Sequence, residues 1–198
     1  MEARGRSCPL SYRYQPEALA QPAQLEADTF FVVGGLYGNP VALAAALERA
    51  ADEPGGPAAT TAGDLLDWFG RADVSVLASS HTGLPYAQAV PDGPRRRLVI
   101  NNGAAGLPNF AGTTYGVVTR LSSNPWVPAD SLYSTTVGTL RCDALAVRFD
   151  LEAWTARFLA QWLPGSPGHR SYFTRITGGT HLRLEQAARS GVQLTAGR

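Results

Sequence analysis

The strongest constraint on the fold is a strand, a glycine-rich turn and a helix that follow one another near residue 35. Residues 29–33 (TFFVV) are β-branched and aromatic, which is typical of a short buried strand. Asn39 is a good helix N-cap and Pro40 a good first helical residue, so we expect a helix over residues 41–51. This unit predicts an α/β domain.

The rest of the chain is rich in strand patterns. A Pro-Asp-Gly-Pro turn between two apolar runs predicts a β-hairpin, and two amphipathic stretches near the C-terminus predict helices. We expect a mixed β-sheet sandwich flanked by helices, formed as a single domain over residues 1–198 with an irregular lead-in over 1–28. The expected strands are 74–79, 86–90, 97–101, 115–121 and 140–149; the expected helical segments are 65–70, 151–163 and 180–190.

Charge and cysteine content exclude several classes of function. All 17 basic residues are arginine and oppose 16 acidic residues, so no basic field exists to hold nucleic acid or a membrane surface. The absence of lysine excludes a Walker-type phosphate loop. Cys8 and Cys142 form no CxxC pair, and no apolar leader follows the first arginines, so we expect a cytoplasmic protein. The run 95–97 (RRR) is expected to be a solvated turn.

The glycine turn before Asn39 is the first candidate site. Backbone N–H groups at such a turn, together with the helix dipole, favour an anion. The glycines run GGxxG and not GxGxxG, so this is not a dinucleotide fingerprint. A plain strand-to-helix turn would need the same glycines.

Two further candidates carry side chains that bind metals. Asp64 and Asp67 follow a small-residue segment, where a carboxylate could hold a divalent ion, although two aspartates three residues apart also mark a helix start. His81 comes directly after an expected strand, where it could bind metal, act as acid or base, or make structural hydrogen bonds.

These segments, in their order along residues 28–121, resemble the motifs of the calcineurin-like metallophosphoesterases. That family opens with a strand, GDxHGN and a helix, where this chain has VVGGLYGN; it continues with GDxxD, matched at 63–67. It then has GHTHxP, a hairpin and a loop like NPGSxGxP, where this chain has SHTGLP (80–85), a hairpin and NNGAAGLP (101–108). The last match is the most specific, because motif, hairpin and loop agree in spacing.

The resemblance implies which residues would form the site. In the family, two metal ions share a bridging carboxylate, activate a hydroxide and clamp a phosphoester. Position by position, Gly35 and Tyr37 stand where the first motif has its aspartate and histidine, and Asn39 is kept. Asp64 and His81 match metal ligands. Gly35, Tyr37 and Asn39 would then touch the substrate.

Several ligands of the family are missing. Gly83 replaces the second histidine of GHTHxP, and the family's GNH[DE] motif has no room between residues 67 and 81. The resemblance therefore implies a shortened member with a degenerate metal centre, whose Mn, Fe or Zn is bound weakly or not at all. It also implies that the strands at 29–33 and 74–79 are neighbours whose carboxyl ends open into one cleft.

Two functions follow as expectations. The first is phosphoester hydrolysis as the inherited reaction, with too few metal ligands for conventional catalysis. The second is a non-catalytic module that binds a phosphorylated small molecule or a protein through the same cleft. A structural remnant with neither activity is a third interpretation.

Overall fold

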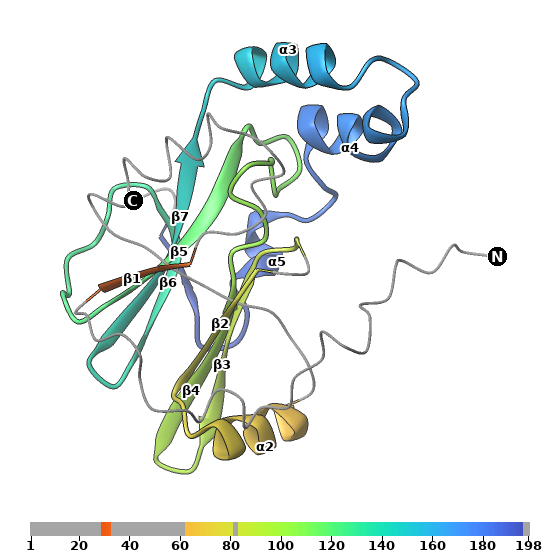
Figure 1. The fold of residues 1–198 in the computed structure, drawn as a ribbon. Helices are drawn as coiled ribbons and strands as arrows, with labels where there is room; N and C mark the ends of the chain where they lie inside the picture. The colour runs from red at the N-terminus through yellow and green to blue at the C-terminus, as the bar shows by residue number, and fades with distance from the viewer. Residues whose placement is uncertain (1–28, 33–61, 81–82, 196–198) are drawn as a thin grey trace.

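The computed structural model describes residues 29–32, 62–80 and 83–195, with side chains from residue 65 onward in the second and third ranges. Its strands form two sheets, and helices flank them (Figure 1). The architecture is the α/β arrangement of β-sheets flanked by helices that the sequence predicts, with one mixed sheet and one antiparallel sheet. The expected lead-in at 1–28 and the expected helix at 41–51 lie outside the described residues.

The larger sheet has five strands in the order β1-β5-β7-β6-β8, and all neighbouring pairs are antiparallel. β7 alternates small and branched side chains that pack on both faces, so it forms the buried middle of the sheet. The strands are β1 (Thr29–Val32), β5 (Tyr115–Ser122), β6 (Ser131–Val137), β7 (Leu140–Arg148) and β8 (Gln193–Leu194).

The smaller sheet has the order β2-β4-β3 and contains the predicted hairpin. β3 (Tyr86–Asp92) and β4 (Arg95–Asn101) pair antiparallel around a turn at Gly93, whose φ of 56° suits glycine. β2 (Val76–Ser79) pairs with β4 in parallel, so both strands end at the same edge.

The main core lies where the two sheets pack together. Buried residues of the hairpin, such as Leu98 and Ile100, share one cluster with Val117 of β5 and Ala144 of β7. Helix α2 (Ala62–Ala72) adds Phe69 and further apolar side chains to this cluster. The cluster therefore joins both sheets and one helix into a single body.

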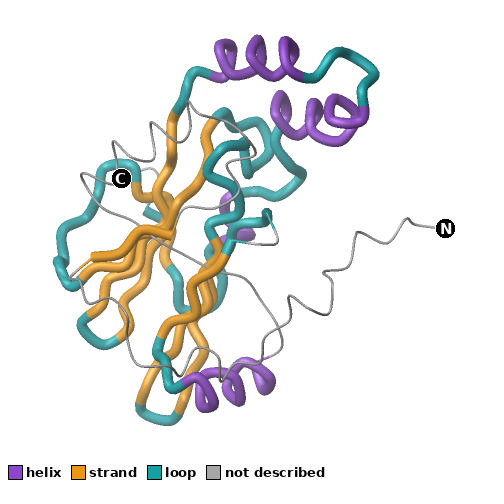
Figure 2. Tube along the Cα trace, viewed as in Figure 1, coloured by secondary structure: helices purple, strands orange, loops and turns teal. Residues whose placement is uncertain are grey.

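Two antiparallel helices, α3 (Leu151–Gln161) and α4 (Pro167–Gly178), extend beyond the sheets (Figure 2). Asp150 caps α3 by accepting from the Ala153 backbone N–H at 2.9 Å, and Ser166 caps α4 in the same way. A second cluster fastens the pair to the loop after β4; its buried members are Ala104, Leu107, Trp154, Phe158 and Ile176.

Two expectations are wrong. The segment 180–190 is helical only over α5 (Leu184–Ala187), because the chain then runs beside β3, where the Ala89 backbone N–H donates to Ser190 O at 2.8 Å. β1 and β2 are not neighbours, because β1 pairs with β5 in the larger sheet and β2 with β4 in the smaller one. Sequence patterns also missed β6, α4 and β8.

No helix in the described part of the chain is both long enough and apolar enough to cross a bilayer.

Candidate functional site

The sequence candidates fall mainly outside the described residues. Gly35, Tyr37, Asn39 and His81 all lie in segments whose placement is not described. The backbone of Asp64 is described and belongs to α2, whereas its side chain is not. Their roles stay predictions.

The helix-start interpretation of the two aspartates is confirmed for the backbone. Residues 63–67 lie within α2, and the exposed Asp67 carboxylate pairs with Arg71 one turn later at 2.9 Å. Figure 1 shows α2 at the end of the smaller sheet where β2 begins, whereas β2 ends with Ser79 at the opposite end of that sheet. Within the described residues, nothing brings α2 to the edge where β2 ends.

That edge consists of two loops held side by side. The first comprises the described residues 80 and 83–85 after β2, and the second, residues 102–109, follows β4. Since Ser79 is in register with Asn101, the loops leave the sheet at the same level. The Asn102 backbone N–H donates to Ser79 O, and the Ser80 hydroxyl donates to Gly103 O, both at 3.4 Å. We call these two loops the strand-end loops.

Gly103 allows the strand-end loops to approach. Its φ is 68°, and a Cβ placed there would lie 2.5 Å from Asn109 Oδ1 and 2.6 Å from Cδ of Pro85. Any other residue would combine backbone strain with overlap against two neighbours. Gly103 is the third residue of NNGAAGLP, so the close approach of the two loops explains why this position of the motif is a glycine.

Asn109 closes the second loop on itself. Its fully buried amide accepts from the Ala104 backbone N–H at 2.8 Å and donates to Ala104 O at 2.5 Å and to Leu107 O at 3.0 Å. Asn102 is also fully buried and donates to Val117 O at 2.9 Å, but its Oδ1 has no hydrogen-bond partner in the described structure. The second loop is therefore buried and is held by hydrogen bonds within it.

Arg175 of α4 bridges the two loops. Its Nη2 donates to Gly83 O at 2.7 Å and to Asn109 Oδ1 at 3.4 Å, and its Nε donates to Pro108 O at 3.1 Å. Arg175 belongs to none of the sequence motifs and lies 92 positions from Gly83 along the chain. Its contact with the two loops is therefore evident only from the fold.

The described side chains do not supply a metal centre. No group of three or more His, Cys, Asp or Glu that could hold an ion occurs among them. His169 stacks on Phe173 with ring centroids 4.6 Å apart, and His181 is exposed. The described atoms at the strand-end loops that could ligate a metal are mainly amide and carbonyl oxygens. The amide oxygen of Asn109 already accepts hydrogen bonds. The described side chains alone therefore do not supply the ligands of the two-metal site that the resemblance implies, and the side chains of Asp64 and His81 lie outside them.

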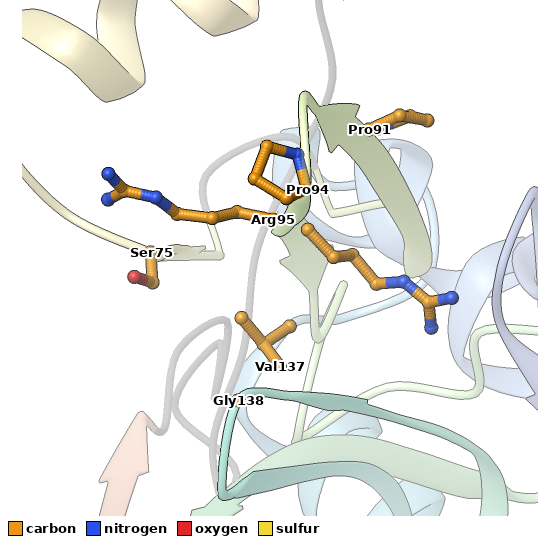
Figure 3. Close-up of a pocket in the computed structure, with 7 residues that line it drawn as sticks. Ser75, Pro91, Pro94, Arg95, Val137 and Gly138 are labelled. Atoms are coloured by element: carbon orange, nitrogen blue, oxygen red, sulfur yellow. The ribbon is translucent and has the colours of Figure 1, made fainter.

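A hollow of about 550 Å³ lies at the hairpin tip, away from the strand-end loops. Its lining, drawn in Figure 3, consists of Ser75, Pro91, Pro94, Arg95, Arg96, Val137 and Gly138. Both arginines are exposed, as expected for a solvated turn. Arg97 differs, because it pairs with Asp92 at 2.8 Å and donates to Val74 O.

Comparisons with known proteins give a distant likeness. No family model matches the chain, and no curated protein matches its sequence. A metallophosphoesterase from Sphaerobacter thermophilus is a similar solved structure, with a TM-score of 0.40 and 17% sequence identity over 62% of this chain. The match covers 49% of that structure, so this chain spans about half of its length.

Proposed function

We propose that this chain is a phosphoester-binding domain of the metallophosphoesterase type, whose inherited reaction is phosphoester hydrolysis and whose metal centre is incomplete. In this proposal His81, directly after β2 in the chain, is the metal ligand that remains, and Gly35, Tyr37 and Asn39 contact the phosphate. Asp64, the second ligand that the resemblance implies, belongs to α2, whose backbone lies at the opposite end of the smaller sheet from the carboxyl end of β2. A bound Mn, Fe or Zn ion would supply charge neutralisation and an activated water.

The observation that carries the proposal is the pair of strand-end loops. The motif SHTGLP, the hairpin and the loop NNGAAGLP are the most specific part of the resemblance, and their described residues are in direct contact at the carboxyl ends of two parallel strands. Ligands of α/β sheets commonly bind at that edge. The contact at Gly103 depends on a residue of the loop motif itself.

The charges explain why we propose weak catalysis. A phosphoester brings one or two negative charges, which the family neutralises with two dications. Even two protein ligands are too few for a tight metal cage, which normally supplies about three or more. The groups proposed to face the substrate, backbone amides, a phenol and an imidazole, bind an anion more readily than they activate water.

The second candidate function is binding without turnover. It is favoured by the hydrogen bonds that join described residues of the strand-end loops to one another and to Arg175. A phosphorylated small molecule or a protein carrying a phosphate would then be the ligand.

A nuclear magnetic resonance titration with inorganic phosphate tests the proposed site. We expect amide shifts at Gly83 and at residues 102–106, with no change at Arg95 or at the rest of the hairpin tip. Shifts confined to the arginine-rich tip, or none at the strand-end loops, would place any anion elsewhere and overturn the proposal.

Calorimetric titration with Mn²⁺ tests the incomplete centre. We expect weak or undetectable binding at micromolar ion, further reduced by His81→Ala. Two tightly bound ions per chain would show that the ligand assignment is wrong.

A further inference from the structure

We infer that Arg175 is the positioning residue for the loop that carries His81, acting from helix α4 through the backbone of Gly83. This inference rests on the proposed function, because it concerns the same site. It adds a residue that no motif of the sequence indicated.

Arg175 joins the two strand-end loops by hydrogen bonds to Gly83 and Pro108, and we call this arrangement the Arg175 clamp. One guanidinium group donates to Gly83 O at 2.7 Å on the first strand-end loop and to Pro108 O at 3.1 Å on the second. The planar fork of arginine suits such divided donation, because its N–H groups diverge at fixed angles. Gly83 is two residues after His81, so the clamp holds the chain close to the histidine.

The helix that carries Arg175 is itself fixed. Ile176 is buried in the cluster that includes Ala104 and Leu107 of the second loop. At the end of α4, Thr180 donates to Asn109 O at 2.6 Å. A Cβ on Gly179 would lie 2.4 Å from Phe110 O, so the backbone of the helix end is pressed against the same loop.

Because of these contacts, loss of the Arg175 clamp can be distinguished from a general loss of stability. Ile176, Thr180 and Gly179 attach α4 to the second loop without Arg175. Removing the guanidinium should leave the helix in place and release Gly83. The first loop would then lose a bond to the rest of the fold, while the second loop keeps Asn109 and its internal bonds.

The chain contains a matched control. Arg170 lies on the same helix and donates to Gly165 O, a local partner just before the helix. Arg170→Met therefore removes an arginine of α4 without touching either strand-end loop. Arg175→Met keeps the aliphatic stem, and Arg175→Lys keeps the charge with less capacity to bridge.

The three histidines report on the clamp by nuclear magnetic resonance, without metal or substrate. We expect Arg175→Met to move the imidazole signal of His81 while those of His169 and His181 stay in place, and to raise amide exchange at Gly83 about tenfold. Arg175→Lys should restore the His81 signal in part, and Arg170→Met should leave all three signals unchanged.

An unchanged His81 signal in Arg175→Met would overturn the inference, as would equal movement of all three histidines, which indicates a loosened helix. Failure of the proposed function is read separately, from the phosphate and Mn²⁺ titrations of the unmodified chain. The histidine signals test the role of Arg175 whether or not the unmodified chain binds phosphate or Mn²⁺.

Discussion

Arg120 and Arg175 both lie within the fold, but they are held in different ways. Arg120 is fully buried on β5 and pairs with the fully buried Asp143 at 3.1 Å. Asp143 also accepts from Arg141 at 2.5 Å and from the Ser131 hydroxyl at 3.1 Å. The described partners of Arg175 are carbonyl and amide oxygens of loops.

The difference separates a structural arginine from a site arginine. Arg120 is needed inside the larger sheet, because a buried charge without its counter-ion is strongly destabilising. Arg175 links the two strand-end loops to a helix that is already anchored, so its loss should change local order more than global stability. The same residue type therefore stabilises one region and positions another.

The largest effect is expected where the charge pair is buried. Asp143→Asn removes the counter-ion of Arg120 and should lower the free energy of unfolding by about 3–5 kcal/mol. Asp67→Asn, which breaks an exposed helical pair with Arg71, should cost about 0.5 kcal/mol or less. Urea unfolding of both variants measures the difference, and similar values for the two would contradict the comparison.

A steric change should come next and falls on the strand-end loops. Gly103→Ala places a methyl group against Asn109 and Pro85 at a positive φ, so we expect a loss of about 2–4 kcal/mol. Gly112→Ala is the matched control, because Gly112 has a φ of 69° but open space around its Cβ position. Its cost should be about 1–2 kcal/mol. Thermal unfolding that ranks Gly112→Ala as the more harmful change would refute the close approach.

Arg175→Met should have a smaller global effect, about 1–2 kcal/mol. The reason is that α4 keeps its contacts through Ile176 and Thr180. Urea unfolding under the same conditions as for Asp143→Asn allows the two losses in the free energy of unfolding to be compared directly. A loss as large as that of Asp143→Asn would make Arg175 a structural residue like Arg120.

The smallest effect at neutral pH concerns one titrating group in each region. Burial raises the pKa of Tyr86, beside the strand-end loops, to about 12, and burial followed by the charge of Asp143 raises the pKa of Cys142 to about 12. Both groups stay neutral in the folded protein at pH values where the unfolded chain loses their protons, so stability is full below about pH 9 and falls as pH rises toward 12.

Tyr86→Phe should remove part of this alkaline loss between pH 10 and 12, with little change at pH 7, because the Tyr86 hydroxyl has no hydrogen-bond partner in the described structure. Cys142→Ala should flatten the curve from pH 9 upward. Unfolding curves at a series of pH values test both variants, and an unaltered slope in both would show that neither group is protected by burial.

Local patterns predicted much of the fold. The hairpin, β5, β7 and α3 follow from alternation, turn residues and amphipathic spacing, and the structure confirms them. β6 was missed because its sequence, SLYSTTV, is polar for a strand, although burial against β7 and β8 holds it in the sheet. The segment after α5 has a helical pattern but pairs with β3 and β6, where tertiary hydrogen bonds outweigh propensity.

The site was less predictable, because its framework joins distant segments. Gly103 could be identified from the loop motif, and a glycine is required there because a Cβ would overlap Asn109 and Pro85. Arg175 could not, since it belongs to no sequence motif, and only the packing of α4 on the second loop brings it to Gly83. The roles of Asp64, His81, Gly35, Tyr37 and Asn39 remain predictions from the resemblance.

Phosphoester turnover tests the central claim most directly. The purified chain is assayed with 4-nitrophenyl phosphate and bis(4-nitrophenyl) phosphate, with and without added Mn²⁺, beside His81→Ala. An incomplete metal centre predicts hydrolysis near background in all samples, with any residual Mn²⁺-dependent rate reduced in His81→Ala. Turnover of about 1 per second or faster, an ordinary enzyme rate, that His81→Ala abolishes would contradict the claim and identify a fully active phosphoesterase.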